Sequence, residues 1–156
     1  MAPRHSGLTW TPVLPSGRRS IGLSVSATVG AVTVDDLLEQ ARARLDRLEP
    51  EEAQEAMDRG AVLIDIRSES QRASDGVVPG ARFVPRNVLE WRLDPASEYR
   101  DPELARADSQ VIVMCNEGYQ SSLAAATLHQ LGIARATDMD GGFQAWRAAG
   151  HPVEAR

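Results

Sequence analysis

The segment Val111-Ile112-Val113-Met114-Cys115-Asn116-Glu117-Gly118-Tyr119-Gln120-Ser121-Ser122 joins a continuous apolar run to the only cysteine of the chain. An apolar run of this length between helical segments is typical of a central parallel strand buried on both faces. Five loop residues follow Cys115, and the sequence predicts a helix from Ser121 onward. In open α/β sheets, ligands bind beyond the carboxyl ends of the strands, where the next helix also presents unpaired N–H groups. Cys115 is therefore a candidate reactive thiol; the alternative is a small buried hydrophobic residue.

Four further stretches accompany this loop along the chain: Leu63-Ile64-Asp65-Ile66-Arg67, Gly76-Val77-Val78-Pro79-Gly80-Ala81, Gly141-Gly142-Phe143-Gln144-Ala145-Trp146 and Gly150-His151-Pro152-Val153. Together with Cys-x-x-Gly-x-x-Ser, from Cys115 to Ser121, they resemble the motifs of rhodanese-like sulfurtransferases, in the family's order. The resemblance covers about residues 49 to 154. It implies a rhodanese-like α/β fold with a central, mostly parallel sheet of about five strands and helices on both faces.

The bulk properties fit one soluble globular domain. The chain has 156 residues, 42% hydrophobic and 25% charged, which is ordinary for such a protein. Its net charge of −5 argues against a nucleic-acid surface, which needs a basic patch or stripe. No apolar run is long enough to cross a membrane. A single cysteine excludes an internal disulfide framework and a multi-cysteine metal site.

We expect three parts along the chain. Residues 1–32 contain no acidic residue and many Ser, Thr and Gly, and the composition predicts a disordered leader. A weak export signal around Arg18-Arg19 and an unused upstream start remain the alternatives for this leader. Residues 33–48 are predicted to form a helix capped at Thr33, which packs on the domain or forms a dimer contact. Residues 49–156 form the rhodanese-like domain, and a cytoplasmic monomer or homodimer is expected.

Hydrophobic periodicity and turn residues predict the elements of that domain. Strands are expected at residues 61–66, 82–84, 111–114 and 136–139, and helices at 50–59, 68–73, 85–95, 121–131 and 143–149. Asp65 lies at the carboxyl end of the first strand. Asp65 and Arg67 either line the site or form an ion pair between loops, and the family resemblance favours the structural role.

The loop suggests a chemistry for the thiol. Five residues return the chain from Cys115 to the helix, so successive N–H groups can surround the sulfur as an anion-binding nest. Such a nest stabilises a thiolate, and also a persulfide, without a metal or an organic cofactor. The substrate-binding candidates are Asn116, Glu117, Gly118, Tyr119, Gln120 and Ser121. Gln120 occupies the loop position that is commonly arginine in active family members, and we expect Arg86 to supply the missing positive charge.

Three functions remain from the sequence. The first is a sulfurtransferase that carries sulfur on Cys115 from a small-molecule or protein donor to a thiol or another nucleophile, with weak use of thiosulfate because of Gln120. The second is a non-catalytic rhodanese-fold module for binding or regulation. The third is a cysteine-dependent phosphatase or arsenate reductase. Against the third, such enzymes use Cys-x5-Arg, and here Ser121 stands at the arginine position and Met114 where histidine is usual.

Overall fold

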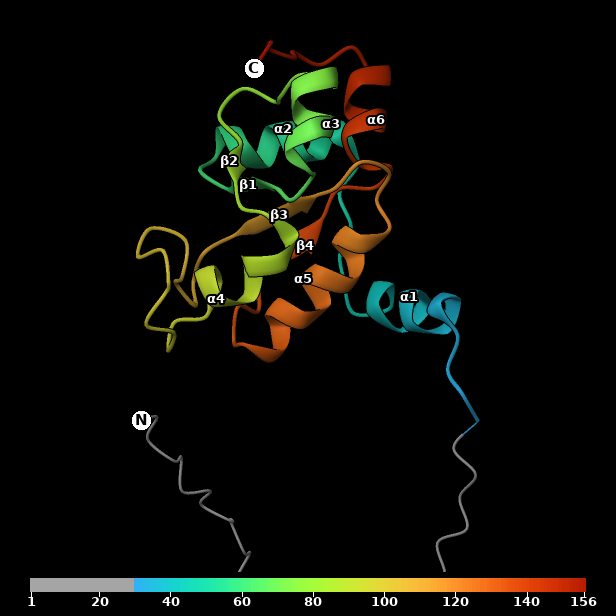
Figure 1. Ribbon diagram of the computed structural model, residues 1–156, viewed down its shortest axis with the longest axis vertical. Coiled ribbons are helices and arrows are strands. Elements are labelled where there is room, and N and C mark those ends of the chain that lie inside the picture. Colours follow the sequence, from blue (N-terminus) through green and yellow to red (C-terminus); the bar gives the residue numbers. More distant parts are fainter. Residues whose placement is uncertain (1–29) are drawn as a thin grey trace, which may run out of the picture. The chain divides into compact units, whose positions relative to one another are not determined.

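The computed structural model describes residues 30–156. The expectation of a disordered leader concerns residues 1–32, of which 1–29 lie outside the described part. The compact unit of interest extends from Val32 to Arg156. Its elements alternate between helices and strands along most of its length (Figure 1).

A parallel sheet forms the centre of the unit. It contains four strands, β1 (Val62–Asp65), β2 (Arg82–Phe83), β3 (Val111–Met114) and β4 (Thr137–Asp138), in the order β2-β1-β3-β4. β3 lies inside the sheet and pairs with β1 along its whole length, from Val62 opposite Val111 to Asp65 opposite Met114. Beyond β4, Leu48 forms a further parallel bridge with Met139. The predicted fold class, a mostly parallel sheet of about five strands, is confirmed.

Helices cover both faces of the sheet (Figure 1). On one face lie α4 (Leu89–Leu93) and α5 (Gln120–Gln130), and on the other lie α2 (Pro50–Asp58) and α6 (Gly142–Ala148), with α3 (Glu69–Asp75) on the same side. Successive strand residues point to opposite faces, so Val111 and Val113 contact the first layer while Ile112 and Met114 contact the second. All four are fully buried. The long apolar run therefore forms the buried central strand that the sequence predicted.

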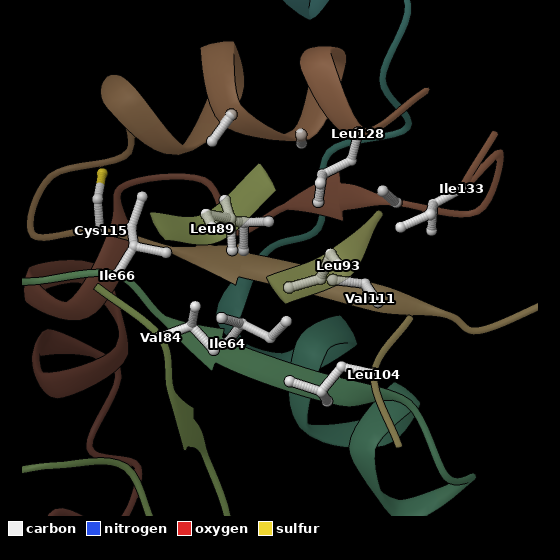
Figure 2. Packing of buried hydrophobic residues seen from close by; sticks show 14 of the residues in the cluster. Ile64, Ile66, Val84, Leu89, Leu93, Leu104, Val111, Cys115, Leu128 and Ile133 are labelled. Carbon is white, nitrogen blue, oxygen red and sulfur yellow. The ribbon is translucent and has the colours of Figure 1, made fainter. Parts of the chain in front are cut away.

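The larger of the two cores connects the sheet to the cysteine. Figure 2 shows Ile64, Val111, Leu128 and their neighbours between the strands and α5, with Cys115 at one end of the row. Alanines on the inner face of α5 let this helix approach the strands closely. Each fully buried Leu or Ile side chain contributes about 1.5–3 kcal/mol of transfer free energy. The strand that carries the cysteine is thus fixed along its whole length before the loop begins.

The N-terminal helix is shorter than the sequence predicted. α1 covers Val34–Arg42, whereas helical spacing indicated residues 33–48. Thr33 caps α1 with a capping box, as expected. After the helix, Leu45 enters the core, and Leu48 pairs with the sheet edge: its N–H donates to the Asp138 carbonyl at 3.0 Å and its carbonyl accepts from Asp140 at 2.8 Å. This backbone pairing overrides the helical pattern. α1 itself packs against α5.

The boundaries of the remaining elements agree with the predictions to within two residues, apart from residues 85–95. That segment is a short 3-10 turn, η1 (Arg86–Val88), followed by α4, rather than one continuous helix. Among residues 30–156, no helix is long and apolar enough to cross a bilayer.

Candidate active site

Cys115 follows β3 directly, at the carboxyl end of the central strand. Its side chain is 2% exposed. The Gly118 N–H donates to Sγ at 3.1 Å, and the thiol donates to Ser121 Oγ at 3.3 Å. The loop can close this tightly because Gly118 has φ +79°, a conformation that suits glycine. The sulfur therefore lies inside the loop rather than on its outer surface.

The start of α6 holds the first half of the loop from outside. The Phe143 N–H donates to the Cys115 carbonyl at 2.9 Å, and the Gln144 N–H donates to the Asn116 carbonyl at 3.0 Å. In a trans peptide the N–H points opposite to the carbonyl. These two bonds therefore turn the next N–H groups, of Asn116 and Glu117, away from α6. A β-carbon at Gly142 would lie 2.5 Å from the Cys115 carbonyl oxygen, so only glycine allows this contact.

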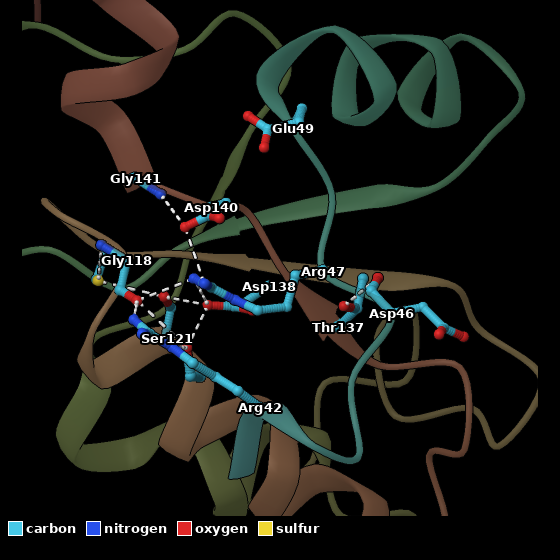
Figure 3. Close-up of polar contacts among 12 residues, drawn as sticks. Arg42, Asp46, Arg47, Glu49, Gly118, Ser121, Thr137, Asp138, Asp140 and Gly141 are labelled. Atoms are coloured by element: carbon cyan, nitrogen blue, oxygen red, sulfur yellow. Dashed lines mark hydrogen bonds and ion pairs between the residues drawn. The ribbon is translucent and has the colours of Figure 1, made fainter. Parts of the chain in front are cut away.

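Two arginines hold the second half of the loop (Figure 3). The Gly118 carbonyl accepts from Arg42 Nη2 at 2.9 Å and from Arg47 Nη2 at 3.1 Å. Ser122 Oγ lies 3.2 Å from the same carbonyl, but its one proton is donated to the closer carboxylate of Asp138 at 2.8 Å. By the same argument, the Tyr119 N–H points away from the arginines. The carbonyls of residues 115, 116 and 118 are thus bound outside the loop, and the N–H groups that follow them face the other way. Successive N–H groups of this kind form an anion-binding nest.

A buried carboxylate connects these parts. Asp138, at the end of β4, is 0% exposed and accepts two hydrogen bonds from Arg47, at 2.9 and 3.1 Å. It also accepts from Ser121 Oγ at 2.9 Å and from Ser122 Oγ at 2.8 Å. Partial burial lowers the pKa of Arg47, but the hydrogen bonds and charges of Asp138 and Asp140 outweigh it and raise that pKa above its usual value. Arg47 is therefore a permanent cation at the back of the loop.

The outer side of the loop borders a hollow of about 370 Å³. The hollow is lined by Gln71, Cys115, Asn116, Glu117, Tyr119 and Gln120. Glu117, Tyr119 and Gln120 are exposed at its mouth. This lining contains no arginine, lysine or histidine and one carboxylate, so the hollow offers an anionic ligand no side-chain cation.

The structure brings the predicted loop residues 115–121 together, whereas the Arg86 side chain binds Glu90 instead of the loop. Arg86 donates twice to the Glu90 carboxylate, at 2.8 and 2.9 Å, and it does not line the hollow. In this structure Arg86 therefore brings no charge to the hollow, and its role in substrate binding stays a prediction. A short i, i+4 pair within the η1–α4 segment neutralises it instead.

Asp65 and Arg67 form a buried ion pair. Arg67 Nη2 lies 2.8 Å from Asp65 Oδ2 and 2.9 Å from the Gly76 carbonyl, and the guanidinium stacks on the Phe143 ring at 3.6 Å. Arg72 of α3 contacts the same carboxylate at 3.2 Å. This group of side chains ties the end of β1 to α3 and α6. Asp65 and Arg67 thus form the ion pair between neighbouring segments that was one of the two roles considered from the sequence.

Several residues of the site were not found from the sequence: Gln71, Arg42, Arg47, Ser122 and Asp138. Asp138 could have been found from the sequence, because it stands at the carboxyl end of a predicted strand. The same position had identified Asp65 as a candidate. The arginines gave no such signal, because helical periodicity places them only on the polar side of a predicted helix. Across residues 30–156, no group of three or more His, Cys, Asp or Glu side chains is placed to hold a metal ion.

The fold and the loop together define a small α/β domain with one cysteine at the carboxyl end of its central strand. Residues 49–149 match the family profile of the rhodanese-like domain, and the chain belongs to that family. It is 36% identical over 102 residues to the thiosulfate sulfurtransferase GlpE of Ectopseudomonas mendocina (strain ymp), covering 65% of this chain and 84% of that protein. It is also 36% identical over 109 residues to GlpE of Pseudomonas fluorescens (strain SBW25), covering 69% and 89%.

Solved structures give the same fold. A protein of unknown function from Rhodopseudomonas palustris CGA009, described as a possible tyrosine phosphatase, superposes with a TM-score of 0.73 at 29% identity and covers 86% of this chain and 100% of its own. A rhodanese-related protein from Thermoplasma volcanium superposes with a TM-score of 0.57 at 22% identity, covering 70% of this chain and 98% of its own. The second likeness concerns the fold alone.

Proposed function

We propose that this protein is a sulfurtransferase that carries sulfane sulfur as a persulfide on Cys115 and passes it to a thiol or another nucleophile. The observation that carries the proposal is the anchoring of the loop carbonyls at 115, 116 and 118 by donors outside the loop. This anchoring leaves N–H groups free to surround the sulfur, and the Gly118 N–H already contacts it. The loop is therefore built to hold negative charge on sulfur.

The reaction divides into two displacements. The Cys115 thiolate attacks the outer sulfur of a donor persulfide, R–S–SH. The donor S–S bond breaks, its electron pair leaves with RS⁻, and the enzyme becomes Cys–S–SH. An acceptor thiolate, R′S⁻, then attacks the outer sulfur, takes it as R′–S–SH, and restores the Cys115 thiolate. No net oxidation occurs, and the two half-reactions need no cofactor.

Ser121 and Asp138 adjust to the charge on the sulfur. In the thiol form, Cys115 donates to Ser121 Oγ, and Ser121 donates to Asp138. When the thiol loses its proton, the Ser121 hydroxyl can rotate and donate to the sulfur instead. Asp138 remains satisfied in that state, because Arg47 and Ser122 still donate to it.

The lining of the hollow favours donors of low negative charge. Gln120 presents a neutral amide where an arginine would offer an anion two parallel hydrogen bonds. Glu117 adds negative charge to the lining of the hollow. The loss of one charge-assisted hydrogen bond costs about 1.5–3 kcal/mol, or roughly a tenfold to hundredfold loss in use of a dianion. The donor we favour is therefore a small-molecule or protein persulfide rather than thiosulfate.

A phosphatase fits this site less well. The position six residues after Cys115, where the phosphatase arginine would bind the oxyanion, is Ser121, which is buried and donates to Asp138. A phosphate in this loop would have neither that guanidinium nor a cationic side chain in the hollow. The name of the Rhodopseudomonas palustris protein makes the comparison worth testing directly.

Mass spectrometry of the intact protein tests the proposal. After incubation with a small-molecule persulfide, the natural protein should gain one sulfur atom (about 32 Da) and lose it on addition of an acceptor thiol. Cys115→Ser should gain none, and since the chain has one cysteine, there is no competing thiol. No gain by the natural protein, or equal gain by the serine variant, would refute the proposal. Hydrolysis of p-nitrophenyl phosphate that depends on Cys115 would favour the phosphatase instead.

A further inference from the structure

The hollow beside Cys115 has no cationic lining, yet two cations lie behind the loop. Arg42 ends α1 and Arg47 follows it, and both precede the residues 49–149 that match the family. Arg47 is neutralised by Asp138 at 2.9 Å and Asp140 at 2.8 Å. Within residues 30–156, no carboxylate lies within salt-bridge distance of Arg42. Arg42 therefore forms no direct ion pair there.

The contacts of Arg42 aim this charge at the cysteine loop. Its Nη2 donates to the Gly118 carbonyl at 2.9 Å (Figure 3) and its Nε donates to Ser122 Oγ at 3.3 Å. Its guanidinium lies 5.5 Å from the centre of the Tyr119 ring. All three partners belong to the loop or to the first turn of α5. Arg42 is half-buried, and the packing of α1 on α5 holds its backbone.

We propose that Arg42 is a positioning residue of the active site that supplies the positive charge absent at Gln120. It acts through the peptide between Gly118 and Tyr119. A guanidinium on the carbonyl polarises that peptide, and a polarised peptide has a stronger N–H donor on its opposite side. The same charge stabilises the negative sulfur of Cys115 through space. This inference rests on the proposed function for its catalytic meaning.

The position of Arg42 also bears on the choice of donor. Because the guanidinium lies behind the loop and outside the hollow, it stabilises charge on the enzyme's own sulfur without presenting a binding fork to the substrate. An arginine in the loop would do both. Arg42 therefore favours a thiolate and a perthiolate on Cys115 while leaving the hollow unfavourable to a dianion. The substrate class that follows is a neutral or weakly charged persulfide.

Arg42 is a better candidate than Arg47 for this role. The charged groups of the loop and its supports are Glu117, Asp138 reached through Ser121, and the two arginines. Asp140 pairs with Arg47, and Asp35 and Glu39 line the same surface hollow as Arg42. Replacing Arg47 would leave Asp138 buried without its cation, and the fold would respond. Replacing Arg42 leaves the Gly118 carbonyl hydrogen-bonded to Arg47, while the one hydroxyl proton of Ser122 is donated to Asp138. A variant at Arg42 should therefore fold and report on the charge alone.

The experiment compares Arg42→Gln and Arg42→Lys with Arg44→Gln. Arg44 is an exposed arginine of the same segment that does not contact the loop, so its replacement makes the same change in net charge. The rate of Cys115 alkylation by neutral iodoacetamide is measured from acidic to alkaline pH. A unit charge about 10 Å from a thiolate changes its ionisation equilibrium by about threefold to tenfold. We expect Arg42→Gln to be slower by that factor near neutral pH and equal to the natural protein at the alkaline plateau.

Arg42→Lys should recover most of the lost rate, Arg44→Gln should match the natural protein, and added salt should reduce the effect of Arg42→Gln. Equal rates for Arg42→Gln and the natural protein would overturn the inference. An Arg42→Lys variant alkylated as slowly as Arg42→Gln would also overturn it. So would an alkylation rate of Arg42→Gln that is lower by the same factor at the alkaline plateau, because that would indicate altered access of iodoacetamide to Cys115.

Sulfur uptake by the same variants separates this inference from the proposed function. Alkylation needs no sulfur transfer, so it reports on Arg42 even if the natural protein takes up no sulfur, a result that would refute only the sulfurtransferase. If the natural protein takes up sulfur, Arg42→Gln should do so about threefold to tenfold more slowly near neutral pH. Uptake at the natural rate by Arg42→Gln would refute the role of Arg42 in the reaction.

Discussion

The replacement of Arg47 by methionine tests how the buried carboxylate is held. Asp138 is fully buried, and its oxygens accept two hydrogen bonds from Arg47 and one each from Ser121 and Ser122. Methionine fills much of the same space but leaves a buried negative charge with two hydroxyl donors. Breaking a buried pair by removing one partner costs about 3–5 kcal/mol. For a unit of this size, that corresponds to a fall in Tm of about 10–20 °C.

Thermal and urea unfolding of four variants isolates the pair. Arg47→Met, Asp138→Asn and the double variant form a cycle whose coupling free energy measures the interaction between the two side chains. Because asparagine removes the buried charge, Arg47→Met should cost less when Asp138 is already asparagine. Arg59→Met is the matched control: Arg59 Nη1 lies 3.6 Å from Glu55 Oε2, and both side chains are exposed, at 68% and 69%. Its effect should stay within about 0.5 kcal/mol.

A cost for Arg47→Met no larger than that for Arg59→Met would refute the pairing of Arg47 with the buried charge. Such a result would mean that Asp138 does not depend on Arg47 for its buried charge. A large effect of Arg47→Met that persists unchanged in the Asp138→Asn background would also contradict it, because the cost would then come from lost packing rather than from the charge.

Two further changes address the loop itself. Gln120→Arg should lower the KM for thiosulfate about tenfold to hundredfold and the KM for an uncharged persulfide much less. Steady-state kinetics at low and high salt would show whether charge is the cause. An equal change in KM for both donors would contradict the electrostatic role of position 120. Gly142→Ala should destabilise by about 2–5 kcal/mol, combining about 1–2 for positive φ with about 1–3 for overlap with the Cys115 carbonyl. Gly132→Ala, at φ +87° with open space around it, should show only the first part in the same unfolding assay.

The central strand, the cysteine loop and the helix after it were predictable because their signals are local. Val111 to Met114 form an apolar run too short for a helix and buried on both faces, and all four are indeed fully buried. Glycine at 76 and serine at 68 mark the two ends of α3, where the structure has a positive φ and a capping box. Each of these features is decided by residues within a few positions of one another.

The supports of the loop were not predictable in the same way. Arg42 and Arg47 meet the Gly118 carbonyl from more than seventy positions away, so the contact depends on how α1 packs against α5 and how Leu48 pairs with the sheet. The direction of the Arg86 side chain depends on its surroundings in the same way. A glutamate four residues along takes its guanidinium, and proximity of the segment to the site in the family did not determine where the side chain points.

The N-terminal segment therefore belongs physically to the rhodanese-like domain, although the family match begins at residue 49. Leu45 contributes a side chain to the main core, and Leu48 pairs with the outer edge of the sheet. Arg47 compensates a carboxylate that would otherwise be buried with its charge unbalanced. A chain that started at residue 49 would lose all three contributions together with Arg42. Its cysteine loop would keep its own sequence and lose both guanidinium groups that orient the Gly118 carbonyl, so the boundary of the family match is not the boundary of the site.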